Sequence, residues 1–326
     1  MTSQLTAVSV HRASIPIIDI SGLSSSSPKE YEAVGTALRS ACLDKGFFYI
    51  SHHGVPDEMI RRVFDQARAF FAQTEADKKA INAGRTGPNR GYEPVGTQVL
   101  EKGMPADLKE SFLIGRELSA DDPRVIAKRF DHGPNFWPQG LADFRSAMQA
   151  YYEAMLKLSW RVMEGLALSL RLPKDYFASF NQDPIATLRL LHYPPQPAVA
   201  AYGEKGCGAH TDFSAITLLL QDDCGGLQIW DETNSQWIYA EPVSGTYIVN
   251  LGDMMARWTN DMYRSTVHRV VNFSGRERYS IPFFYSGHAD YPIEPIPTCM
   301  VNGGIQKYRK TTVEAHLRER ILATRG

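Results

Sequence analysis

Helical periodicity dominates the first half of the chain. Apolar residues recur every three or four positions over residues 29–45, 56–79 and 141–170, which predicts a helix in each segment. Two short apolar runs, 15–20 and 47–50, predict strands, and the second ends at the turn 53–56. The first half is therefore expected to be mainly helical, with a few strands.

The pattern changes between these helices and again after the last of them. Residues 83–138 are rich in Gly and Pro and predict loops with short strands, and β-type runs dominate from Pro184 onward. These runs are 186–191, 215–220, 226–230, 237–240, 246–250, 266–272 and 279–284. Regularly spaced short strands indicate an antiparallel sandwich or barrel, and a last helix is predicted over 312–323. We expect an α+β protein in which a mixed helical region, 1–175, packs on a β-rich region, 176–326.

Composition limits the classes of partner. The chain has 326 residues, is 43% hydrophobic and 22% charged, and carries a formal net charge of −1. Such a charge gives no indication of nucleic acid or of an anionic membrane as a partner. No apolar stretch approaches the roughly 20 residues that cross a bilayer, and the first 20 residues lack the continuous apolar segment of a secretory signal. We therefore expect a cytoplasmic protein, whose oligomeric state the sequence does not set.

The cysteines give no sign of a disulfide framework or a zinc site. Cys42, Cys207, Cys224 and Cys299 are scattered along the chain, and none forms a C-x-x-C pair. We expect reduced thiols rather than metal ligands.

A candidate metal centre lies in the β-rich region. His210 and Asp212 are two positions apart, and His268 follows 56 positions after the aspartate. On an extended strand, residues i and i+2 point to the same face, and another strand can complete that face. Two histidines and one carboxylate leave open positions on an octahedral metal, as in non-haem iron(II) oxygenases. The residues alone do not decide the metal, because catalytic zinc uses the same ligand types and an H-x-D triplet also occurs by chance.

A candidate carboxylate-binding pair follows the last histidine. Arg278 and Ser280 are again two positions apart, so a strand would direct both to one face. A guanidinium is a planar fork suited to a carboxylate, and a hydroxyl can add one further bond. The partner could be an Asp or Glu of the protein itself or the distal carboxylate of a bound small acid. Beside a metal face, the second interpretation is favoured.

Taken together, these motifs resemble a known family. The stretch His210-Thr211-Asp212 with its continuation to residue 220 is similar to iron/2-oxoglutarate-dependent dioxygenases of the isopenicillin N synthase-like group. The other matching segments are 225–228, 250–253, 265 with 268–270, 278–280, and, in the N-terminal half, 15–20, 46–50, 53–55 and 91–92. The order and spacing of these motifs are kept over nearly the whole chain, which makes the resemblance highly specific.

The resemblance implies a fold and a reaction. The fold is a double-stranded β-helix, or jelly roll, with flanking N-terminal helices and a C-terminal helix. His210, Asp212 and His268 look like the facial triad that binds Fe²⁺. The expected function is oxidation of a small organic substrate with O2, by hydroxylation, desaturation or cyclisation, coupled to oxidative decarboxylation of 2-oxoglutarate.

The resemblance also assigns residues to the co-substrate. Arg278 and Ser280 look like the pair that binds the C5 carboxylate of 2-oxoglutarate, and Tyr193 falls where many members place a tyrosine that also contacts it. One departure is Leu191, which stands where many plant relatives have Asn. It removes a polar contact near the co-substrate, so the effect of Leu191 on co-substrate use is an open question.

Other functions are compatible with parts of this pattern. An iron oxidase of the same fold that uses no 2-oxoglutarate is the main alternative, and Leu191 keeps it open. A non-catalytic binding protein is disfavoured by the intact triad, and a zinc hydrolase by the lack of an H-E-x-x-H motif. The substrate is not readable from the sequence. Met254, Phe283 and Tyr285 are candidates for the pocket wall or for simple core, and the loop 91–100 is a further candidate for the wall.

Overall fold

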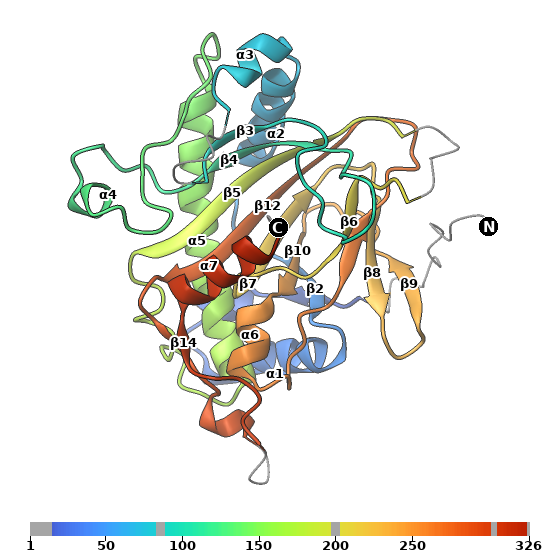
Figure 1. The fold of residues 1–326 in the computed structure, drawn as a ribbon. Coiled ribbons are helices and arrows are strands. Elements are labelled where there is room, and N and C mark those ends of the chain that lie inside the picture. Colours follow the sequence, from blue (N-terminus) through green and yellow to red (C-terminus); the bar gives the residue numbers. More distant parts are fainter. Residues whose placement is uncertain (1–14, 83–88, 197–202, 301–304, 325–326) are drawn as a thin grey trace.

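The largest feature of the fold is an eight-stranded sheet (Figure 1). The structure, a computed structural model, describes residues 15–82, 89–196, 203–300 and 305–324. The strand order is β1-β2-β10-β7-β12-β5-β4-β3, and β1 and β2 are parallel while the other neighbours are antiparallel. The strands are β1 (Ile17–Asp19), β2 (Phe47–Ser51), β3 (Gly91–Glu93), β4 (Glu110–Ile114), β5 (Pro184–Tyr193), β7 (Ile216–Gln221), β10 (Tyr247–Leu251) and β12 (Arg278–His288).

A smaller sheet completes the jelly roll. It has four strands in the order β6-β11-β8-β9. Their bounds are β6 (Cys207–His210), β8 (Leu227–Asp231), β9 (Gln236–Tyr239) and β11 (His268–Val270), and the short strands β13 (Pro292–Ile293) and β14 (Thr311–Thr312) pair with each other. Residues of both larger sheets line one cavity. The α+β class with a jelly-roll core is therefore confirmed.

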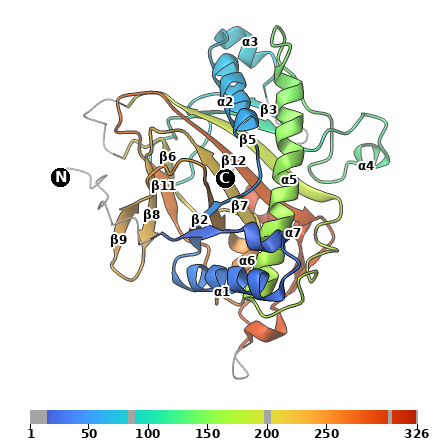
Figure 2. The ribbon, with the colours of Figure 1, turned by 180° about the vertical axis from the view of Figure 1, so that it is seen from behind.

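Helices cover one face of the main sheet, opposite the smaller sheet (Figure 2). The long helix α5 (Phe144–Ser169) packs against α1 (Pro28–Asp44) and α2 (Asp57–Phe71). Its apolar stripe is part of the core, and Met148, Tyr151 and Met155 are completely buried. The remaining helical elements are η2 (Ser21–Ser24), α3 (Glu75–Lys79), α4 (Pro123–Ile126), α6 (Asp253–Trp258), η3 (Pro297–Cys299) and α7 (Val313–Thr324).

The helix predicted over 56–79 is wrong in one respect, because it is two helices. Helix α2 ends at Phe71, and α3 begins at Glu75. Between them, the Thr74 side chain accepts a hydrogen bond of 3.2 Å from the backbone N–H of Asp77. A threonine that satisfies a free amide in this way starts a new helix, and periodicity alone does not show such a cap.

Two elements near the predicted metal residues were not predicted. Strand β6 has four residues and helix α6 has six, which is too short for a periodic pattern. The expectation that His210 and Asp212 share one extended strand is also wrong, because β6 ends at His210. Asp212 lies in the turn after the strand, where its carbonyl accepts a hydrogen bond of 2.8 Å from the N–H of Asp253.

The structure also bears on the predicted division of the chain, on membrane-spanning helices and on the cysteines. Strands β1 to β4 belong to the first 175 residues yet pair in the same sheet as strands of the later part, and the division at 175 and 176 stays a prediction. In the described ranges, no helix has the length and apolar character needed to cross a membrane. Residues 1–14, which bear on the expected absence of a signal, lie outside the described residues. All four cysteines are free thiols.

A glycine at the irregularity of β12 provides a test of the packing. Gly287 has a φ of +74° and lies where the pairing of β12 with β5 shifts register. A Cβ on Gly287 would lie 1.9 Å from Cε2 of Phe180, whereas a Cβ on Gly275, with a φ of +69°, would meet no atom within 4 Å. Both Gly→Ala changes strain the backbone by about 1 kcal/mol, but only Gly287→Ala adds a core clash of about 1–3 kcal/mol.

Urea unfolding of the two variants should therefore give a lower midpoint for Gly287→Ala than for Gly275→Ala. Gly275→Ala serves as the matched control for the positive φ. Equal midpoints would show that Phe180 moves aside without cost and would contradict the packing described here.

Candidate metal centre

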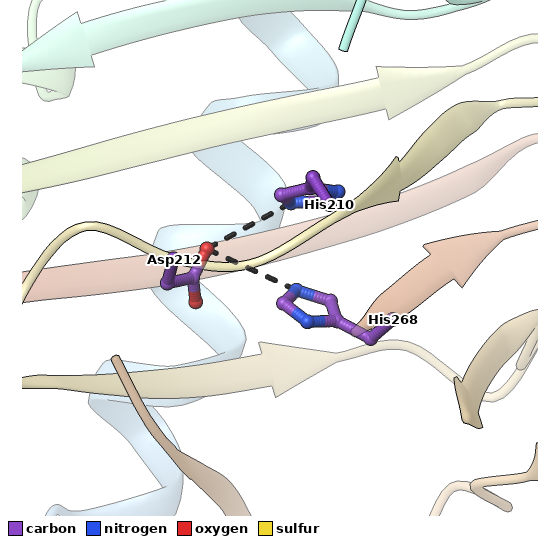
Figure 3. Close-up of side chains that lie close together, drawn as sticks. All are labelled: His210, Asp212 and His268. Atoms are coloured by element: carbon purple, nitrogen blue, oxygen red, sulfur yellow. Dashed lines mark ion pairs between the residues drawn. The ribbon is translucent and has the colours of Figure 1, made fainter. Parts of the chain in front are cut away.

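The three residues predicted as metal ligands lie together at the end of the smaller sheet (Figure 3). His210 is the last residue of β6, and His268 is the first residue of β11. These strands are antiparallel neighbours, and their register pairs His210 with His268. Asp212 reaches the same point from the turn after β6. One candidate ligand atom from each residue lies within 4.8 Å of the other two.

Both imidazole rings turn the same nitrogen toward the carboxylate. Nε2 of His210 lies 3.7 Å from Oδ1 of Asp212, and Nε2 of His268 lies 3.8 Å from the same oxygen. Nδ1 of His210 is 2.8 Å from the carbonyl oxygen of Gly208, and Nδ1 of His268 is 3.1 Å from that of Thr266. A carbonyl oxygen only accepts, so each Nδ1 carries the proton of the neutral ring and donates it. Each Nε2 is then left with a free lone pair directed at the centre.

The carboxylate of Asp212 is oriented in a similar way. Its Oδ2 accepts hydrogen bonds from the hydroxyl of Thr217, at 2.6 Å, and from the side-chain amide of Asn250, at 2.7 Å. Oδ1 therefore faces the two imidazoles. Burial by itself would raise the pKa of Asp212, but the positive charge that His268 and His210 carry when protonated, together with the two hydrogen bonds, outweighs it and lowers the pKa below its ordinary value. The centre thus presents an ionised oxygen beside two nitrogen lone pairs.

Sequence reasoning did not assign roles to Thr217 and Asn250. Both stand in motifs that carry the family resemblance, yet nothing in their spacing relates them to Asp212. A signal was nevertheless present, because each is a buried polar residue in an apolar strand. A buried polar side chain needs a hydrogen-bond partner. This identifies such residues as candidates without naming the partner.

The Arg278 side chain forms a second cluster in the same barrel. It is completely buried, donates to Ser280 Oγ at 3.1 Å and to Gln221 Oε1 at 3.2 Å, and also donates to the carbonyl of Gly225. Its guanidinium carbon lies 4.7 Å from the centroid of the Tyr193 ring. Among the described residues, no Asp or Glu forms an ion pair with Arg278. A buried cation without an ion-pair partner is costly, so the cluster suits an incoming carboxylate, although Asp222 is close enough for the guanidinium to favour its ionised form.

One cavity connects the two clusters. The structure therefore brings together all six residues predicted for the site, and they line the cavity with Leu191. Those six are His210, Asp212, His268, Arg278, Ser280 and Tyr193. Leu191 pairs in register with Ser280 and is 7% exposed, so it gives the wall an apolar surface at that point.

The rest of the wall differs from the candidates named on sequence. Met254, Phe283 and Tyr285 belong to the main hydrophobic core. The residues of β12 that line the cavity are instead Pro282 and Phe284, which continue the alternation begun by the arginine and serine of the same strand. Leu100, the last residue of the predicted loop 91–100, also lines the cavity.

Two further cations on the cavity wall were not predicted. Lys109 forms a buried ion pair with Asp107, and Arg189 forms a half-buried ion pair of 2.5 Å with Glu93. Arg189 interrupts an apolar run in β5, which is the signal that could have identified it. Lys109 precedes β4 and carries no comparable signal.

The donor set fits a divalent iron ion. Two neutral imidazole nitrogens and one carboxylate oxygen on one side of a metal are the ligands of non-haem iron(II) oxygenases. The structure prepares all three by binding their remote atoms to the protein, as metal sites commonly do. Zinc accepts the same ligand types, so the choice of metal needs the comparison with known proteins.

Two family models match the chain. Residues 15–140 match the N-terminal region described for a non-haem dioxygenase in morphine synthesis, and residues 184–287 match the 2OG-Fe(II) oxygenase superfamily. The chain is 43% identical over 307 residues to the 2-oxoglutarate-Fe(II) type oxidoreductase hxnY of Emericella nidulans, covering 93% of this chain and 88% of that one. It is 41% identical over 319 residues to the 2-oxoglutarate-dependent dioxygenase citB of Monascus ruber, covering 95% of each.

A solved structure agrees with these matches. The crystal structure of a full-length Neurospora crassa protein in complex with alpha-KG and thymine superimposes with a TM-score of 0.85 and 32% identity, over 98% of this chain and all of that one. Alpha-KG is 2-oxoglutarate, so the comparisons favour a 2-oxoglutarate-dependent enzyme over an oxidase that does without it. Iron(II), 2-oxoglutarate and O2 are the corresponding cofactor and co-substrates. The chain belongs to the 2OG-Fe(II) oxygenase superfamily and is a 2-oxoglutarate-dependent non-haem iron dioxygenase.

Proposed function

We propose that His210, Asp212 and His268 are the iron(II) ligands of this dioxygenase. The observation that carries the assignment is the convergence of two Nε2 atoms on one carboxylate oxygen, at 3.7 and 3.8 Å. The opposite atoms of all three side chains are engaged by the protein. Without a cation, this arrangement would leave the nitrogen lone pairs facing an anionic oxygen, which is unfavourable.

The co-substrate assignment rests on Arg278. We propose that its guanidinium and the Ser280 hydroxyl bind the distal carboxylate of 2-oxoglutarate, with the Tyr193 side chain packed against the arginine. The buried guanidinium, which forms no ion pair among the described residues, would then gain a carboxylate partner. Leu191, on β5, adds no polar contact, so we expect the carboxylate to be bound by the two side chains of β12, Arg278 and Ser280.

The metal and the protein have different roles in the proposed reaction. When bound, iron(II) activates O2 with electrons from 2-oxoglutarate, which is decarboxylated to succinate and carbon dioxide while the substrate is oxidised. The protein holds the ligand atoms in place, orients the co-substrate through Arg278 and excludes water. Leu227 and Val270, which line the cavity beside the metal residues and belong to a buried cluster, serve the last role.

We propose that the substrate is a small organic molecule bound near Leu100, Arg189 and Phe284. These residues line the same cavity as the triad and offer both apolar and polar contacts. Nε of Arg189 is buried without a hydrogen-bond partner among the described residues, so it can donate to a polar atom of a ligand. The Neurospora crassa protein forms a complex with thymine, which supports a small organic molecule as the substrate here.

Anaerobic titrations should separate the two halves of the site. Iron(II) with 2-oxoglutarate should give a weak visible charge-transfer band in the wild-type protein. His210→Ala should lose iron binding and the band together. Arg278→Ala should keep iron, measured by equilibrium dialysis, while the dissociation constant for 2-oxoglutarate rises by about 100-fold, because a buried charged contact is worth about 2–5 kcal/mol.

Arg278→Lys is the matched control, since it keeps the charge and loses the planar fork. It should weaken 2-oxoglutarate binding less than Arg278→Ala does. Iron binding by His210→Ala with wild-type affinity would disprove the ligand assignment. Parallel losses of iron and 2-oxoglutarate in Arg278→Ala would disprove the separate role of the arginine.

The protonation of His268 gives a pH test in the metal-free protein. Burial, and secondarily the neighbouring His210, lower the pKa of His268 to about 4, although Asp212 opposes the shift. The folded protein should keep this ring neutral, and thus ready to bind a metal, down to about pH 4. An unfolded chain takes up the proton near pH 6.5, so this group's contribution to stability should decline as the pH falls from about 6.5 to about 4.

Titration of the histidine ring signals by NMR measures this pKa directly, and the signal absent from His268→Asn identifies the residue. A midpoint near 4 is expected. A midpoint near the ordinary 6.5 would mean that the ring is solvated and not held as described.

A further inference from the structure

The strand that ends at His210 contains a bulge. Strand β11 pairs His268 with His210 and Val270 with Cys207. Two residues of β6, Gly208 and Ala209, therefore stand opposite a single residue of β11. Such a bulge bends the strand and changes the direction of the side chain that follows it. The direction of the His210 ring thus depends on how the bulge is held.

Side-chain carboxylates hold the bulge from outside the sheet. Strand β6 is at the edge of its sheet, with β11 as its only neighbour in the strand order of the described residues. The N–H of Gly208 donates to Oδ1 of Asp107 at 2.8 Å, and the N–H of Ala209 donates to Oε2 of Glu101, also at 2.8 Å. Both acceptors belong to the segment 101–107, between β3 and β4. This segment takes the place of a missing neighbouring strand at the bulge.

Lysines fix both carboxylates. Lys109 pairs with Asp107, and the two side chains are 3% and 2% exposed. Lys205 pairs with the same Oε2 of Glu101 that accepts from the bulge, at 3.0 Å. An exposed edge strand is ordinarily satisfied by water, so two ion-paired acceptors at neighbouring amides are a built feature of this edge.

A glycine permits the close approach of the two segments. A Cβ on Gly208 would lie 2.8 Å from Cβ of Glu101 and 2.9 Å from its backbone nitrogen. Any other residue at position 208 would push the segment 101–107 away from the bulge. Leu100, which lines the cavity, immediately precedes this segment. The segment 101–107 is therefore connected to the cavity wall as well as to the strand that carries His210.

We infer that Glu101 and Asp107 are positioning residues that hold the bulge of β6 and thereby direct Nε2 of His210 toward the metal. The inference rests on the proposed function in one respect, namely that His210 is an iron ligand. Neither carboxylate touches the metal centre itself. Their effect passes through the backbone of Gly208, whose carbonyl also accepts the Nδ1 proton of His210.

Glu101 is the residue to test, because its side chain is 26% exposed. Removing Asp107 would leave Lys109 buried and unpaired, which would destabilise the whole fold. Glu101→Gln and Glu101→Met form a matched pair of similar length and equal charge. Only Gln keeps an oxygen that can accept from both Ala209 and Lys205.

The readouts are the visible spectrum of the cobalt(II)-substituted protein and the dissociation constant for iron(II), measured against a chromophoric chelator. Glu101→Met should change the cobalt spectrum and raise the iron dissociation constant by about tenfold, at the lower end of the effects of residues that orient metal ligands. Glu101→Gln should stay within about twofold of wild type, because its oxygen can still accept both hydrogen bonds. Glu294→Ala, which removes an exposed ion pair with Lys310, should have no effect on either readout.

Two results would overturn the inference. One is a wild-type spectrum and iron affinity for Glu101→Met. The other is an equal change in Glu101→Met and Glu101→Gln, which would assign the effect to charge rather than to the hydrogen bond. His210→Ala, measured alongside, separates this failure from that of the proposed function, because a variant that binds iron as wild type does would remove the premise instead.

Discussion

The geometry of the metal centre depends on hydrogen bonds made by the atoms that face away from it. The carbonyls of Gly208 and Thr266 accept from the Nδ1 atoms of the two histidines, and Thr217 and Asn250 donate to the remote oxygen of Asp212. These bonds fix the tautomer of each ring and the rotation of the carboxylate. Three ligand atoms therefore face one point before any metal arrives, and the cost of ordering them is met during folding.

The jelly roll explains how such distant residues converge. The smaller sheet carries the two histidines on neighbouring strands, while β7 and β10 of the main sheet supply the residues that orient the aspartate. Strand β12 lies between β7 and β5 and places the guanidinium of Arg278 inside the barrel. The helices α1, α2 and α5 bury the outer face of the main sheet, which stabilises the frame without entering the site.

Much of this was readable from the sequence, for identifiable reasons. Alternation along β12 correctly predicted that Arg278 and Ser280 share a face, and the apolar stripe of α5 correctly predicted a long core helix. The same rule gave the wrong geometry for Asp212, because β6 ends in a turn that local pattern does not reveal. Contacts such as that between Glu101 and Ala209 join residues 108 positions apart and depend on the tertiary fold, so no spacing rule could predict them.

Iron(II) and 2-oxoglutarate should occupy the two connected clusters. The most direct test is a crystal structure grown without oxygen with iron(II) and 2-oxoglutarate, with diffraction recorded at the iron absorption edge. One strong anomalous peak is expected among His210, Asp212 and His268, with density for the co-substrate extending from that peak to Arg278. A peak bound by other residues, or co-substrate density that does not reach the guanidinium, would contradict this assignment.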